Sequence, residues 1–141
     1  MSVALPLAVL ARTAEPVAVV RRFLALDAVV TGANGLAYLA AAGPLGRLLG
    51  VDSGLLTGLG AFLALYGLGV GALARRGEPW RTGVRAVVEV NAAWTLLSAV
   101  ALALWLSPTT AGAVWTVLQA VTVGGFALLQ HLALRAVEDA G

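Results

Sequence analysis

Four long apolar segments, separated by short polar or proline-containing breaks, dominate the 141-residue chain. We predict a membrane-spanning helix from each, because about 20 mostly apolar helical residues cross a bilayer core and lipid favours helices. The expected spans are residues 23–42, 54–74, 86–106 and 111–134. Gly43-Pro44 and Ser107-Pro108 are expected to end the first and third spans, since proline interrupts a helix.

Composition supports an all-α polytopic membrane protein with a four-transmembrane-helix bundle over residues 21–141. The chain is 60% hydrophobic and only 11% charged, which is too apolar for a water-soluble domain of this size. Residues 1–20 are expected to form a cytoplasmic or interfacial lead-in.

Few kinds of chemistry remain open to this composition. The absence of cysteine excludes disulfides and thiolate metal sites. We find no phosphate-binding glycine loop and no helical His-x-x-x-His pair. We therefore expect no metal and no organic cofactor. The net charge of +2 comes from arginines at helix ends, so no nucleic-acid partner is expected either.

The arginines predict the orientation of the bundle. Eight fall on one side of the four-span arrangement and Arg47 alone falls on the other. The eight are Arg12, Arg21, Arg22, Arg75, Arg76, Arg81, Arg85 and Arg135. Because cytoplasmic loops are enriched in basic residues, we predict a multi-pass protein of the cell inner (cytoplasmic) membrane with both termini in the cytoplasm.

A shift of 64 residues aligns the two halves of the chain. The matched pairs are Arg21 and Arg85, Asp27 and Asn91, Thr31 and Thr95, and Pro44 and Pro108, while residues 60–66 overlay residues 124–130. We interpret this as an internal repeat of one helical hairpin. Two such hairpins would be parallel repeats about an axis along the membrane normal, an arrangement known from transporters.

A stripe of polar residues follows one face of the first span. Its members are Asp27, Thr31, Asn34 and Tyr38, spaced so that they share a helix face. A carboxylate inside a span is costly and usually faces a bundle interior or a water-filled cavity. Asp27 is therefore either a functional carboxylate or a structural partner of Arg85, His131 or a bundle amide.

Three titratable residues are expected at one depth and are the candidate catalytic residues. Asp27, Glu89 and His131 each lie four to six residues from a flanking arginine, or roughly 6–9 Å from the cytoplasmic edge. Glu89 has a structural alternative in an ion pair with Arg85, one turn away. For His131 the alternative is contact with lipid headgroups.

Seven polar or aromatic residues are candidate substrate-binding positions. They are Asn34, Tyr38, Tyr66, Asn91, Trp94, Gln119 and Gln130. Each also has a structural alternative, because amides inside spans often join helices and aromatic rings often serve only packing. Gly67-x-x-x-Gly71 permits close helix approach, either within the bundle or in a homodimer.

The first hairpin carries three short motifs, Gly32-x-x-Gly35, Gly43-Pro44-Leu45 and Leu48-Leu49-Gly50. In these the chain resembles small four-span DoxX-like bacterial membrane proteins, in topology over residues 21–135 and in motif over residues 27–50. The resemblance implies a four-helix membrane bundle and no single chemistry. Asp27 departs from the apolar pattern expected there, and no functional residue is carried over.

Three functions fit these patterns. The first is binding or transport of a small lipophilic or cationic molecule in a polar cleft of the bundle. An acid in the first of four spans is also similar to small multidrug-resistance exporters, which are proton-coupled. The second is a membrane-embedded cyclase or isomerase with Asp27 or Glu89 as general acid. The third is an accessory membrane subunit without chemistry of its own.

Overall fold

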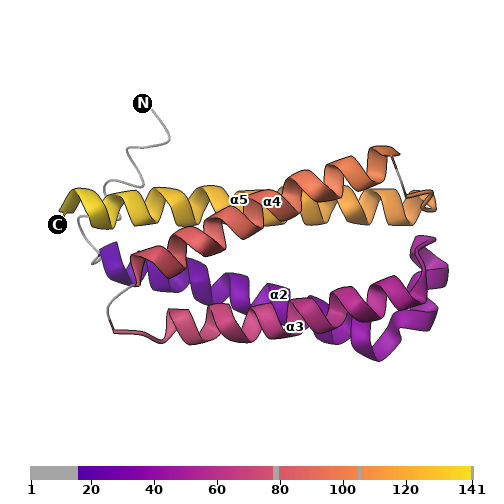
Figure 1. The fold of residues 1–141 in the computed structure, drawn as a ribbon, viewed down its shortest axis with the longest axis horizontal. Helices are drawn as coiled ribbons and strands as arrows, with labels where there is room; N and C mark the ends of the chain where they lie inside the picture. The colour runs from indigo at the N-terminus through magenta and orange to yellow at the C-terminus, as the bar shows by residue number, and fades with distance from the viewer. Residues whose placement is uncertain (1–15, 78–79, 105, 141) are drawn as a thin grey trace.

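The computed structural model describes residues 16–77, 80–104 and 106–140, and these form four helices (Figure 1). The helices are α2 (Pro16–Leu49), α3 (Ser53–Ala74), α4 (Arg81–Leu104) and α5 (Thr110–Ala140). All four are long and apolar enough to cross a membrane, which confirms the predicted all-α four-helix bundle. The chain is a multi-pass membrane protein. Of the predicted lead-in, residues 16–20 belong to α2 and residues 1–15 lie outside the described part.

Helix α2 runs further than its predicted end at Gly43-Pro44. It is interrupted at Ala41, where φ is −133° and ψ is 33°, and then resumes to Leu49. Pro44 explains the interruption, because its ring has no N–H to donate and crowds the carbonyl one turn earlier. Gly50, at φ 68°, finally reverses the chain. Asp52 then caps α3 by accepting a hydrogen bond from the Leu55 amide at 3.0 Å.

The first hairpin packs closely through glycines on both helices. A Cβ at Gly35 would lie 2.5 Å from the Ala64 nitrogen, and one at Gly60 would lie 2.9 Å from the Gly35 oxygen. Apolar side chains gain little by moving from lipid to a helix interface, so membrane helices associate mainly by close packing. Small residues make this close approach possible. The second hairpin, α4 with α5, lies against the first mainly through α2 and α5, whereas α3 and α4 contact each other sparsely.

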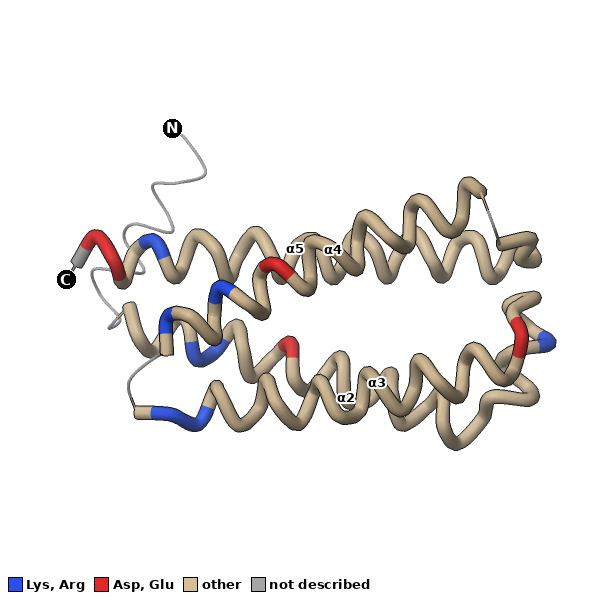
Figure 2. The backbone as a smooth tube through the Cα atoms, viewed as in Figure 1, with Lys and Arg blue, Asp and Glu red and all other residues tan. Residues whose placement is uncertain are grey.

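Most charged residues gather at the two ends of the bundle, and two acidic positions, one on α2 and one on α4, lie between them (Figure 2). We call one end the arginine end; it holds Arg21, Arg22, Arg75, Arg76, Arg81, Arg85 and Arg135, the start of α2 and the end of α5. We call the other the loop end; it holds the turns around residues 50–52 and 106–109. Between them the outer surface is mostly apolar, as suits a bilayer, with large exposed side chains such as Leu65 and Leu68.

Positions 64 residues apart make equivalent contacts near the arginine end. Three such pairs are buried in one apolar cluster: Val20 with Val84, Val70 with Leu134, and Leu73 with Val137. Arg21 donates to the Ala74 oxygen at 2.9 Å. Arg85 donates to the side chain of Glu138 at 2.6 Å, and positions 74 and 138 are themselves 64 apart.

Candidate functional site

Asp27 is buried in the centre of the bundle and accepts three hydrogen bonds. The side chain is 1% exposed. One carboxylate oxygen accepts the Thr31 hydroxyl at 2.8 Å. The other accepts the Asn91 amide at 2.8 Å and the Gln130 amide at 2.8 Å. The acid therefore joins α2 to both helices of the second hairpin.

The two amides continue the network toward α3. Asn91 also donates to the Gln130 oxygen at 3.0 Å, so both of its amide hydrogens face acceptors. The Tyr66 hydroxyl lies 3.2 Å from the Asn91 oxygen and 3.4 Å from the Val87 carbonyl. We call Asp27, Thr31, Tyr66, Asn91 and Gln130 the Asp27 layer, in which all four helices take part.

In the Asp27 layer, the acid accepts its hydrogen bonds from uncharged side chains of the described residues. No basic side chain hydrogen bonds to Asp27 within residues 16–77, 80–104 and 106–140; Arg85 is paired with Glu138 instead. The partners considered for Asp27 were Arg85, His131 and a bundle amide, and the structure shows the amides of Asn91 and Gln130. No buried side-chain nitrogen or oxygen of the described residues lacks a partner, so the layer is complete without a ligand.

Glu89 and His131 do not join Asp27. Both side chains are exposed on the outside of the bundle, and neither makes a side-chain hydrogen bond to another described residue. Figure 2 shows the single acidic position in the middle of α4 apart from the one on α2. The three candidate catalytic residues therefore do not share one site.

A cavity of about 310 Å³ lies between the hairpins, from the Asp27 layer toward the loop end. Small-molecule sites occupy about 300–1,000 Å³. Its walls are mostly apolar, and no charged side chain of the described residues lines it. Thr31, Tyr66 and Asn91 belong to both the cavity wall and the Asp27 layer, so this layer is the floor of the cavity on its arginine-end side.

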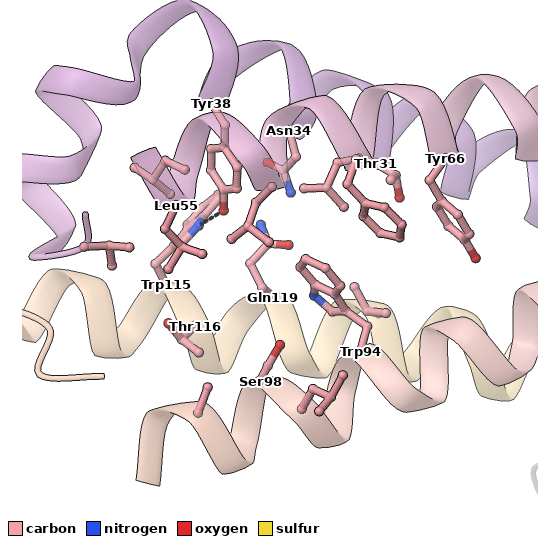
Figure 3. A pocket seen from close by; sticks show the side chains of 18 of the residues that line it. Thr31, Asn34, Tyr38, Leu55, Tyr66, Trp94, Ser98, Trp115, Thr116 and Gln119 are labelled. Atoms are coloured by element: carbon pink, nitrogen blue, oxygen red, sulfur yellow. Dashed lines mark hydrogen bonds between the residues drawn. The ribbon is translucent and has the colours of Figure 1, made fainter. Parts of the chain in front are cut away.

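Polar side chains from α2, α4 and α5 point into this space, beside Tyr66 of α3 (Figure 3). Tyr38 and Trp115 are already paired, since the indole N–H donates to the tyrosine oxygen at 2.7 Å. Asn34, Ser98 and Gln119 also line the cavity, and their side chains make no hydrogen bond to any residue of the described ranges. These three are available to a ligand.

Three stacked aromatic rings stand beside the floor. Phe62 stacks on Tyr66 with ring centres 5.8 Å apart and on Trp94 with ring centres 6.0 Å apart. The second contact is where α3 meets α4. All three rings line the cavity, so one wall offers aromatic faces.

Of the predicted binding residues, six line the cavity and Gln130 lies in the Asp27 layer beneath it. The six are Asn34, Tyr38, Tyr66, Asn91, Trp94 and Gln119. Phe62 and Trp115 line it as well, although neither was a predicted contact. Phe62 lies four residues before Tyr66 and Trp115 lies four residues before Gln119, and both Tyr66 and Gln119 were predicted contacts. Residues four apart share a helix face, so helical periodicity could have identified the two missed residues.

Comparison with known proteins adds no family to this description. No family model, curated protein or solved structure matches the chain. The DoxX-like resemblance therefore stays a prediction, and the function has to be argued from the site.

Proposed function

We propose that the protein binds a small, neutral, lipophilic molecule with at least one hydrogen-bonding group in the cavity between its hairpins. The observation that carries this proposal is the combination of apolar and aromatic walls with Asn34 and Gln119. The two amides come from opposite hairpins, point into the same space and have no described protein partner (Figure 3). A few convergent polar groups in an apolar pocket are typical of small-molecule sites.

A neutral ligand fits this site better than a cation. Asp27 is a buried acid bonded to the cavity-lining side chains of Thr31 and Asn91, but both of its carboxylate oxygens are occupied by donors. Asn91 and Thr31 stand between it and the cavity space. We therefore assign Asp27 the role of holding the polar floor in place, with ligand contact left to the residues above it.

Catalysis has less support from this geometry. General acid–base chemistry needs the acid within hydrogen-bond reach of the reacting group. Glu89 and His131 lie on the outside of the bundle, and Asp27 is not among the residues that line the cavity. The accessory-subunit hypothesis also has no specific observation in its favour.

We further propose that the arginine end faces the cytoplasm of a bacterial cell whose inner membrane holds the protein. The support is the number of arginines there against Arg47 alone at the loop end. The cavity then occupies the outer half of the membrane.

We also infer that the hairpins are repeats of one ancestral hairpin. The matched buried positions and the two arginine contacts near the arginine end support it. So does the Asp27 layer, because Asp27 bonds directly to Asn91, 64 residues away. Tyr66 and Gln130 of the same layer are also 64 apart.

Photolabelling of the full chain in lipid nanodiscs tests the binding proposal. The probe is a neutral aryl diazirine that carries a benzylic alcohol, and its control is the same diazirine without the hydroxyl group. We expect labelling of cavity residues that excess benzyl alcohol suppresses. Gln119→Leu should weaken binding of the alcohol about tenfold, the loss of one hydrogen bond, and should not weaken binding of the hydrocarbon.

Uniform, non-saturable labelling of lipid-facing residues such as Leu65 and Leu68 would overturn the proposal. An equal loss of both probes in Gln119→Leu would show that the amide supports the fold and does not contact the ligand.

A further inference from the structure

The two seams between the hairpins differ sharply. The seam between α2 and α5, with the turn that precedes α5, is hydrogen-bonded at three levels between the arginine end and the loop end. Gln130 bonds to Asp27 near the arginine end, Trp115 bonds to Tyr38 further along, and Thr109 closes the loop end. The Thr109 hydroxyl donates to the Leu48 oxygen at 2.7 Å, and its amide donates to the Leu49 oxygen at 3.2 Å.

Among the described residues, the seam between α3 and α4 is joined only from its middle to the arginine end. Tyr66 reaches Asn91 and the Val87 carbonyl there, and Phe62 stacks on Trp94. Toward the loop end, the described residues of α3 and α4 make no hydrogen bond or aromatic contact with each other. The helices instead present apolar side chains, Leu55 and Leu59 on one side and Leu97 and Ala101 on the other.

The cavity reaches the lipid-facing surface at this seam. Leu55 is 45% exposed and Leu97 is 60% exposed, and both also line the cavity. Five large apolar residues combine these two properties, and four of them are on α3 or α4. They are Val30, Leu55, Phe62, Val90 and Leu97.

The inferred repeat offers a reason why only one seam is closed by polar contacts. The α2–α5 seam is filled by Tyr38 and Trp115, whereas the positions 64 residues away hold Leu102 and Val51. The equivalent of a hydrogen-bonded aromatic pair is thus a leucine and a valine. Neither aliphatic side chain has a group that could form the hydrogen bond that Trp115 makes to Tyr38, and together they are smaller than that aromatic pair.

We infer that ligands reach the cavity sideways from the bilayer, through the gap that Leu55, Leu59, Leu97 and Ala101 border on the loop-end half of the α3–α4 seam. This inference rests on the proposed function and specifies its substrate class as molecules already dissolved in the membrane. The Phe62–Trp94 stack is the inner limit of the gap. The polar group of the ligand enters first and reaches Asn34 and Gln119, and the apolar part of the ligand follows it from the lipid.

A reversible tether across the gap tests this route. The chain has no native cysteine, so Leu59→Cys with Leu97→Cys introduces the only two thiols. A short bifunctional methanethiosulfonate then joins α3 to α4 one turn from the stack. The nanodisc protein is loaded with the alcohol diazirine before tethering, challenged with excess benzyl alcohol, and illuminated after increasing delays.

We expect the tether to slow loss of the bound probe at least tenfold and reduction of the tether to restore fast exchange. The matched control is the same double variant carrying two monofunctional reagents, which adds bulk without a bridge and should exchange quickly. Equal exchange in tethered and control protein would overturn the side route and leave binding itself intact. Failure of the untethered variant and of the unsubstituted protein to bind the probe would overturn the proposed function, and the route with it.

Discussion

At the scale of single residues, the defining feature is a carboxylate that depends on neutral donors. Burying an acid in an apolar bundle is costly unless its oxygens are hydrogen-bonded. Asp27 meets this requirement with one hydroxyl and two amides from three helices. Each of those donors in turn depends on the acid, because without it their N–H and O–H groups would be buried and unpaired.

Asp27→Asn is therefore expected to destabilise the bundle by about 1–3 kcal/mol, the cost of leaving a buried donor unpaired. Whichever way the new amide turns, its NH₂ group replaces one of the two oxygens that now accept hydrogen bonds. Either the Thr31 hydroxyl or the Asn91 and Gln130 amides then lose their acceptor. Reversible unfolding in mixed detergent micelles measures the change. Glu89→Gln is the control, because that side chain is exposed on the outside of the bundle. Equal stability of Asp27→Asn and the unsubstituted protein would contradict the structural role.

At the scale of helices, the two hairpins are held together differently. In the first, Gly35 and Gly60 bring the backbones of α2 and α3 into contact. In the second, the position matching Gly60 is Gly124, whose Cβ would meet the Thr95 side chain at 3.4 Å. Gly67 is matched by His131, which faces outward. The first hairpin is thus the more closely packed half, and the second hairpin has the looser packing.

Gly35→Ala tests this difference. The added methyl group would meet the Ala64 and Gly60 backbones at 2.5 and 2.8 Å, so the helices must separate, at about 1–3 kcal/mol for overpacking. Gly69→Ala is a matched change on α3 with nothing within 4 Å. It should be neutral or stabilise by up to about 1 kcal/mol, as alanine favours helix over glycine. Thermal unfolding followed by circular dichroism compares them, and equal midpoints would argue against the close contact.

At the scale of the whole molecule, the uneven distribution of charge sets the orientation that we propose. The arginine end and the loop end are separated by four long, mostly apolar helices. A cavity near one end of such a bundle serves one leaflet more than the other. The orientation therefore decides which leaflet supplies the ligand.

Single cysteines report the orientation directly. Ser53 begins α3 at the loop end and Thr82 lies in the first turn of α4 at the arginine end, and both are exposed. A membrane-impermeant maleimide should modify Ser53→Cys in intact cells and Thr82→Cys only after permeabilisation. Modification of Thr82→Cys alone in intact cells would reverse the proposed orientation.

The bundle was predictable from sequence because lipid leaves an apolar segment of this length few alternatives to a helix. The Asp27–Asn91 contact was also within reach, since the 64-residue shift places these residues at equivalent positions. The outward direction of Glu89 follows from the helical angle between it and Asn91. The continuation of α2 to Leu49 was missed because Pro44 interrupts that helix without ending it. A cleft in the bundle and six of the residues that line it were expected, but the size of the cavity and its mostly apolar walls could not be predicted, because they depend on how far apart side-chain volumes hold α3 and α4.

The Asp27 layer also determines what each half of the chain can assemble with. Two copies of the first hairpin, arranged as the two halves are now, would bring Asp27 against a second Asp27 in a buried space. The carboxylates would repel, and neither would receive the amide donors that Asn91 and Gln130 supply. Two copies of the second hairpin would bring Asn91 against Asn91 with no acid to accept their hydrogens. The pairing of the two different hairpins, which the chain joins covalently, is therefore more stable than the pairing of either hairpin with its own copy.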